Sequence, residues 1–178
     1  MNARNDRFSR RGFVVGSILV GVAAATRGDV ATAQSALRQA ADPMVPMPAQ
    51  VAAKDALAQL PDTRLWYSDT GGTGQPVVFL HPASGSALIW GYQQPVFAAA
   101  GYRVITYSRR GHHNSEPVPN DKPGSGSQDL HHLMELLGVG KFHAVASAAG
   151  VSYAIDYALS HPDRLSSMVL ASGTGGRS

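Results

Sequence analysis

The sequence contains no cysteine. This absence excludes disulfide bonds, thiol nucleophiles and any metal site that needs thiolate ligands. A phosphate-binding glycine loop is also missing, because the GGTG stretch over residues 71–74 precedes an apolar run of strand length and not a helix. The adjacent histidine pairs at 112–113 and 131–132 lack the spacing of helical metal ligands. We therefore expect no cofactor and no metal ion.

Charge is scarce and unevenly distributed. Charged residues make up 15% of the chain, and its net charge of +3 arises in the first 33 residues. The remaining sequence carries equal numbers of basic and acidic residues. With no excess of positive charge in this part, there is no reason to expect it to bind an acidic polymer, so we expect no nucleic-acid partner.

The uncharged run near the N-terminus, residues 12–26, is too short to span a bilayer comfortably as a helix. It comes after an arginine-rich start and precedes the small residues ATA at 31–33. The stretch SRRGFVV at 9–15 resembles the twin-arginine signal. We expect residues 1–33 to be an export signal read by the twin-arginine machinery and cleaved near Ala33, which makes the protein periplasmic or secreted. An ordinary secretory signal and an uncleaved anchor are the alternatives.

Residues 34–62 differ in composition from the remainder of the chain. They are rich in alanine and contain Pro43, Pro46 and Pro48 close together. This composition predicts a flexible leader, with one run over residues 49–60 that could form a helix.

From residue 63 onward, strand-length apolar runs alternate with helical patterns. The strands are expected near 64–68, 76–80, 103–108, 142–146 and 167–171, and the helices near 88–100, 126–137 and 151–160. Continuous apolar strands are typical of a parallel sheet that helices cover on both faces. The alternation predicts an α/β fold with a doubly wound, mainly parallel sheet over residues 63–178.

The stretch over residues 142–160 predicts a strand that turns through small residues directly into a helix. A nucleophile held in such a strained turn needs small residues two positions before and two after it. Ala146 and Gly150 meet this demand around Ala148. If Ser147 stood at the apex, the β-branched Val145 would occupy the crowded position. We expect Ala148 at the apex, and the alternative is a shifted turn with Ser147 there.

This turn, ASAAG at 146–150, resembles the G-x-S-x-G nucleophile elbow of the α/β-hydrolase superfamily. The resemblance extends to VVFLHP at 77–82, to SRRGHHNS at 108–115 and to YALSHPDRL at 157–165. In the second of these, Ser108 replaces the aspartate of the family's D-x-R-G-x-G-x-S loop, and His113 replaces its second glycine. The resemblance covers residues 64–172, the front part of the family's domain. It implies a sheet that is C-terminally incomplete, without the lid, the acid and the histidine of the family's triad.

The resemblance also implies a site. Ala148 stands at the nucleophile position, where a methyl group cannot attack an acyl carbon. The oxyanion hole would be formed by the backbone N–H groups of Ala83 and Ala149. The expected pocket residues beside it are His81, Pro82 and Ser84.

The function implied is that of an exported hydrolase for a small ester or amide-like carbonyl substrate. Ala148 predicts that the chain is inactive as a serine hydrolase, and the shifted turn with Ser147 would still lack an identified histidine base. The alternatives are a non-catalytic homologue that binds a small carbonyl ligand and a truncated gene product.

Overall fold

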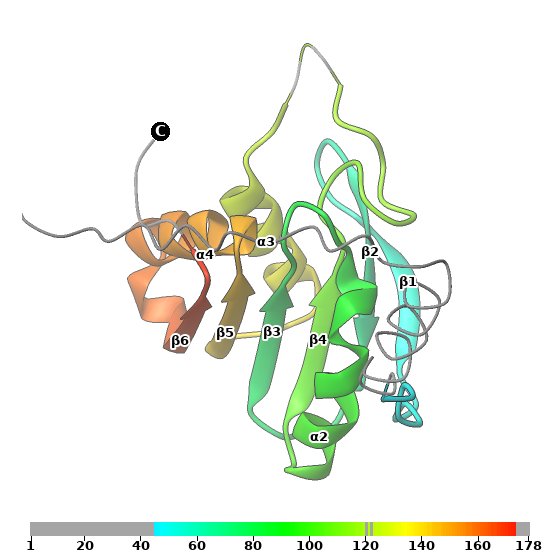
Figure 1. Cartoon of the computed structure of the whole chain (residues 1–178). Helices are drawn as coiled ribbons and strands as arrows, with labels where there is room; N and C mark the ends of the chain where they lie inside the picture. Colours follow the sequence, from blue (N-terminus) through cyan, green and yellow to red (C-terminus); the bar gives the residue numbers. More distant parts are fainter. Residues whose placement is uncertain (1–44, 120, 122, 174–178) are drawn as a thin grey trace, which may run out of the picture. The chain divides into compact units, whose positions relative to one another are not determined.

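The computed structural model describes residues 45–119, 121 and 123–173, which form a six-stranded sheet (Figure 1). The strand order is β1-β2-β4-β3-β5-β6. Strands β4, β3, β5 and β6 run parallel, and β1 and β2 are antiparallel at one edge. The predicted α/β fold with a mainly parallel sheet is confirmed. The strand bounds are β1 (Lys54–Gln59), β2 (Arg64–Asp69), β3 (Pro76–Leu80), β4 (Arg103–Tyr107), β5 (Phe142–Ser147) and β6 (Leu165–Ala171).

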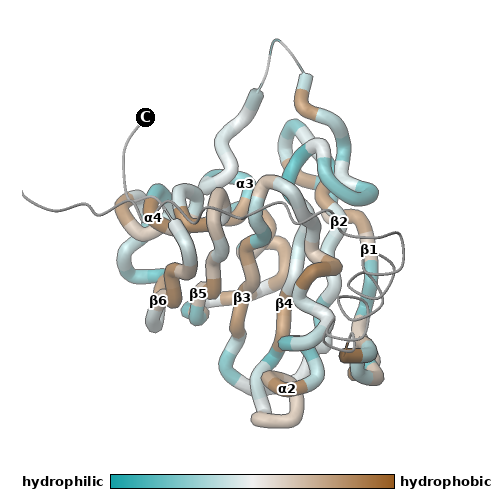
Figure 2. Tube along the Cα trace, viewed as in Figure 1, coloured by the Kyte–Doolittle hydropathy of each residue, from teal (hydrophilic) through white to brown (hydrophobic). Residues whose placement is uncertain are grey.

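Helices cover both faces of this sheet, as the continuous apolar strands require. Along β3, Val77 and Phe79 pack on one face in a small cluster with residues of η1 and α2. Val78 and Leu80 point to the other face and join a larger core with residues of α3 and α4. Figure 2 shows the apolar colouring along β3 at the centre of the sheet. The helical segments are η1 (Ala87–Tyr92), α2 (Gln93–Ala99), α3 (Gly126–Leu136), α4 (Ala149–Ser160) and η2 (Pro162–Arg164).

Strand β1 corrects one prediction. It lies inside the stretch 34–62 that we expected to be a leader, and the helix expected over residues 49–60 is wrong. Ala56 and Ala58 pair with Tyr67 and Leu65 of β2, and Ala58 is buried. Alanine-rich sequence favours a helix locally, but pairing with β2 outweighs that weak propensity. The sheet therefore begins upstream of the boundary predicted at Thr63.

Strand β6 forms the other edge of the described sheet. Apart from the half-buried Leu165, its residues are exposed, including Met168, Val169 and Leu170. No helix within residues 45–119, 121 and 123–173 is long and apolar enough to cross a bilayer. The export signal expected over residues 1–33 lies outside the described residues.

Candidate active site

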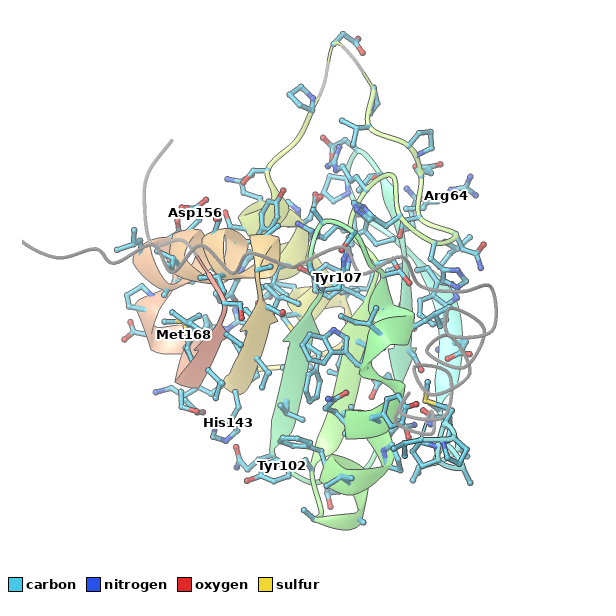
Figure 3. The ribbon with its side chains drawn as sticks, in the orientation of Figure 1. Arg64, Tyr102, Tyr107, His143, Asp156 and Met168 are labelled. Atoms are coloured by element: carbon cyan, nitrogen blue, oxygen red, sulfur yellow. The ribbon has the colours of Figure 1, made fainter. Side chains whose placement is uncertain are left out.

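The loops that come after β3, β4 and β5 lie at the carboxyl end of the sheet (Figure 1). Ligands of open α/β sheets bind outside this end of the strands. Tyr107, the fully buried last residue of β4, marks this level of the sheet and is labelled in Figure 3. The candidate site consists of three segments, namely residues 81–86, 108–116 and 147–150.

Ala148 forms the turn between β5 and α4. Strand β5 ends at Ser147, and α4 begins at Ala149. The backbone of Ala148 has φ 47° and ψ −115°, a combination that residues with a Cβ atom avoid. Its N–H donates to the carbonyl oxygen of Ala171 (2.9 Å), and its own carbonyl oxygen accepts from the N–H of Val151 (3.0 Å). Ser147 stays in the strand, so the strained apex belongs to Ala148.

Gly150 shows why the residues after this turn are small. A Cβ atom at Gly150 would lie 2.5 Å from the carbonyl oxygen of Leu80 and 3.0 Å from that of His81. The start of α4 therefore touches the end of β3 backbone to backbone. This contact brings the turn after β5 beside the loop after β3.

His81 is fully buried in that loop. Its Nδ1 lies 2.7 Å from the carbonyl oxygen of Pro82, which can only accept, so Nδ1 carries the proton. Its Nε2 accepts from the backbone N–H of Arg109 at 3.0 Å. Burial is the main cause that lowers the pKa of His81 to about 4, and the neighbouring Arg109 and His112 lower it further. His81 is thus a neutral ring with both nitrogens occupied, and it cannot act as a general base.

Arg109 contacts the same peptide group as His81. Its Nη2 donates to the carbonyl oxygen of Pro82 at 3.0 Å, and its guanidinium lies 4.5 Å from the ring centre of Tyr153 in α4. Because the peptide bonds of the described residues are trans, the N–H of Ala83 points away from the Pro82 oxygen. Two donors on the Pro82 oxygen therefore fix the direction of the Ala83 N–H and polarise it.

The N–H groups of Ala83 and Ala149, expected to form the oxyanion hole, have no hydrogen-bond partner in the described part of the chain. Ala83 is exposed and Ala149 is half-buried. Two preorganised amides aimed at one oxygen stabilise developing negative charge by roughly 3 kcal/mol each. Ser84, expected in the pocket, is exposed and makes no hydrogen bond with the described residues, whereas Pro82 is half-buried.

His112 is a loop contact that the sequence alone does not reveal. Its Nε2 lies 3.1 Å from the carbonyl oxygen of Ala83, and its Nδ1 lies 2.9 Å from that of Arg110. Both partners only accept, so a neutral ring donates to one of them and the protonated ring donates to both. His112 therefore ties the loop after β3 to the loop after β4.

Arg110 joins the loop after β4 to helix α3. Its Nε and Nη2 each lie 2.7 Å from a carboxylate oxygen of Asp129, and Nη2 also lies 2.7 Å from Asp62. Arg110 and Asp129 are both buried. Asp129 lies in α3, 19 residues from Arg110 in the chain, and the sequence signal for this pair is the arginine of the D-x-R-G pattern.

A family model described as the alpha/beta hydrolase fold matches residues 75–176. The match covers more than half of the chain. The chain belongs to the α/β hydrolase fold family. Membership is consistent with the strained strand-to-helix turn at Ala148, since the family's nucleophile elbow is a turn of this kind.

The relatives in this family include several hydrolases. The 2-hydroxy-6-oxononadienedioate/2-hydroxy-6-oxononatrienedioate hydrolase of Burkholderia vietnamiensis is 33% identical over 123 residues, which cover 66% of this chain and 43% of the relative. The 2-hydroxy-6-oxo-6-phenylhexa-2,4-dienoate hydrolase of Comamonas testosteroni is 32% identical over 129 residues, or 70% of this chain and 44% of the relative. The chain thus spans less than half the length of these relatives.

Solved structures agree with this assignment. A bromoperoxidase from Bacillus anthracis is 34% identical with a TM-score of 0.61, and the match covers 67% of this chain and 45% of that protein. A mutant epoxide hydrolase from Vigna radiata is 25% identical with a TM-score of 0.61, and the match covers 66% of this chain and 38% of that protein. Proteins whose names describe different activities therefore share this fold.

Proposed function

We propose that this chain is an exported α/β hydrolase fold protein that binds a small carbonyl compound at the carboxyl ends of β3 and β5 and does not hydrolyse it through a serine. One observation carries this proposal: the strained apex of the elbow is Ala148, with φ 47° and ψ −115°. The side chain at this position is a methyl group, which offers neither a nucleophile nor a proton donor.

Carbonyl binding is supported by what remains around the missing nucleophile. The peptide between Pro82 and Ala83 is held by two donors, from His81 and Arg109, and its N–H is unpaired within the described residues. The N–H of Ala149 is likewise unpaired there. Groups held in this way do not reorganise when a polarised carbonyl oxygen arrives.

The relatives suggest the ligand class. The name of the Burkholderia vietnamiensis relative describes an oxo compound, and a carbonyl group is what two amide donors recognise. A small ester, amide or ketone therefore fits the proposal. A serine hydrolase that uses Ser147 fits less well, because Ser147 lies in β5 before the turn and His81 has both ring nitrogens occupied.

Two measurements test the proposal. In a titration of the ¹⁵N-labelled protein with acetophenone, the amide signals of Ala83 and Ala149 should shift together and saturate, while that of Ala100 at the end of α2 should not move. Hydrolysis of p-nitrophenyl acetate should stay at the buffer rate. Saturable turnover, or labelling by a fluorophosphonate probe that disappears in Ser147→Ala, would contradict the proposal.

Export can be tested separately. We propose that residues 1–33 direct the chain to the twin-arginine machinery and that cleavage near Ala33 releases it outside the cytoplasm. The double variant R10K/R11K should then remain in the cytoplasm at full length, whereas R4K should be exported and shortened like the unchanged protein. Normal export of R10K/R11K would indicate an ordinary secretory signal.

A further inference from the structure

Arg109 and Arg110 are neighbours in the chain and are equally buried, with 7% of each residue exposed, but they differ in their partners. Arg110 forms ion pairs with Asp129 and Asp62. Within the described residues, Arg109 forms no ion pair. A buried positive charge is costly unless a negative charge or a full set of hydrogen bonds compensates it.

The contacts of Arg109 compensate it only in part. Its Nη2 donates to the Pro82 oxygen, its Nε lies 3.4 Å from Nε2 of the neutral His81, and Tyr153 contributes its ring face. In the described part of the chain, Nη1 of Arg109 has no hydrogen-bond partner, and neither has the buried Nη1 of Arg110. Each Nη1 carries two N–H bonds, so four N–H bonds of the two adjacent guanidinium groups have no acceptor among the described residues.

A cavity of about 300 Å³ lies against these two arginines. Among the described residues, the unpaired charge in its lining is that of Arg109, because Arg110, which also lines it, is paired with Asp129 and Asp62; His112 and Tyr153 form part of its wall. The acid in the lining is Asp129, and both of its carboxylate oxygens are bonded to Arg110, which neutralises its charge toward the cavity. The volume is at the lower end of the range for small-molecule sites.

We propose that this cavity binds the carboxylate group of a small organic acid and that Arg109 is the residue that holds it. A carboxylate oxygen can accept a charge-assisted hydrogen bond from Nη1 of Arg109, which has no partner among the described residues, and the carboxylate would supply the negative charge that Arg109 lacks. The site does not depend on carbonyl binding at the elbow. Its carboxylate has two sources: a separate acid, or the acid group of a ligand whose carbonyl lies near Ala83 and Ala149.

Benzoate and benzamide test the proposal, because the two molecules have nearly the same shape and differ in charge. At constant ionic strength and pH 7, benzoate should bind the unchanged protein at least tenfold more tightly than benzamide. This difference should disappear in Arg109→Gln and persist in Arg64→Gln, a control that removes an exposed arginine paired with Glu116. Equal affinities in the unchanged protein, or a difference that survives Arg109→Gln, would overturn the proposal.

Arg109→Gln could also disturb the loop after β3, so a measurement on the unchanged protein is needed as well. Benzoate should shift the Nε–Hε NMR signal of Arg109, and benzamide should leave it in place. A signal that benzoate does not shift would overturn the proposal.

Phenylglyoxylate, which carries a ketone beside its carboxylate, distinguishes the two sources of the carboxylate. If one ligand serves both places, it should also shift the amide of Ala149, which benzoate should leave in place; the amide of Ala83 does not discriminate, because Arg109 bonds its peptide group. Failure of acetophenone to bind, with benzoate still held by Arg109, would contradict the carbonyl site alone.

Discussion

The turn after β5 and the loop after β3 touch one another, but they are held in place in different ways. The turn at Ala148 is fixed by backbone hydrogen bonds and by the close approach of Gly150 to Leu80. The loop at residues 81–83 is fixed by the side chains of His81, Arg109 and His112. One is thus a steric arrangement of backbone segments in close contact, and the other a polar arrangement of side chains such as His81 and Arg109, 28 positions apart.

This difference decides how each region responds to change. Where two backbones are in contact, no flexible side chain can move aside, so an added methyl group must displace the helix or the strand. A polar network changes when one member gains or loses a proton or a partner. We therefore expect the turn to be sensitive to volume and the loop to be sensitive to charge.

Gly150→Ala should have the largest effect on stability. The new methyl group would lie 2.5 Å from the backbone oxygen of Leu80, and we expect the free energy of unfolding to fall by about 4 kcal/mol. Urea denaturation measures the change. Gly140→Ala is the matched control, since a Cβ atom there has no described atom within 4 Å. Similar losses in both variants would contradict the steric account of the turn.

Asp129→Asn should have the next largest effect, on the polar side of the comparison. It removes the carboxylate that bonds Nε and Nη2 of the buried Arg110, and we expect a loss of about 3 kcal/mol in the free energy of unfolding. Glu116→Gln is the control, because it breaks the exposed ion pair with Arg64 and should change stability very little. A small effect of Asp129→Asn would mean that Asp62 alone satisfies Arg110.

The titration of His81 should make stability depend on pH. The pKa of this ring is lowered from 6.5 to about 4 by burial, so the unfolded chain takes up its proton first as the pH falls. The contribution is therefore fully present above pH 6.5 and is lost as the pH falls toward 4, with a total of about 2 to 3 kcal/mol. Urea denaturation between pH 7 and 4 measures it, and His81→Gln should flatten the curve over that interval. An unchanged slope in the variant would assign the pH dependence to other groups.

The same contrast explains what the sequence could predict. The turn at Ala148 could be located because its requirements are local: small residues at Ala146 and Gly150, between a strand and a helix. The main strands could be located because each is a continuous apolar run. Both features depend on residues that are adjacent in the sequence.

The polar half of the site could not be predicted in the same way. The pairing of Arg110 with Asp129, and the contact of Arg109 with Pro82, depend on which loops the folded sheet brings together. Strand β1 was missed for the same reason, because its short alanine-containing sequence becomes a strand only by pairing with β2. Long-range contacts decide these features, and a single sequence does not record them.

The smallest expected effect has the opposite sign. Ala148→Gly should raise the free energy of unfolding by about 1 kcal/mol, because glycine adopts φ 47° and ψ −115° without the strain that a Cβ atom brings, and this gain exceeds the added entropy of the unfolded chain. Ala149→Gly, one residue later in the first turn of α4, should instead lower stability by somewhat less than 1 kcal/mol. Urea denaturation of the two variants measures both changes. A loss of stability in Ala148→Gly would mean that the turn is not strained, and the steric half of the comparison would then rest on Gly150 alone.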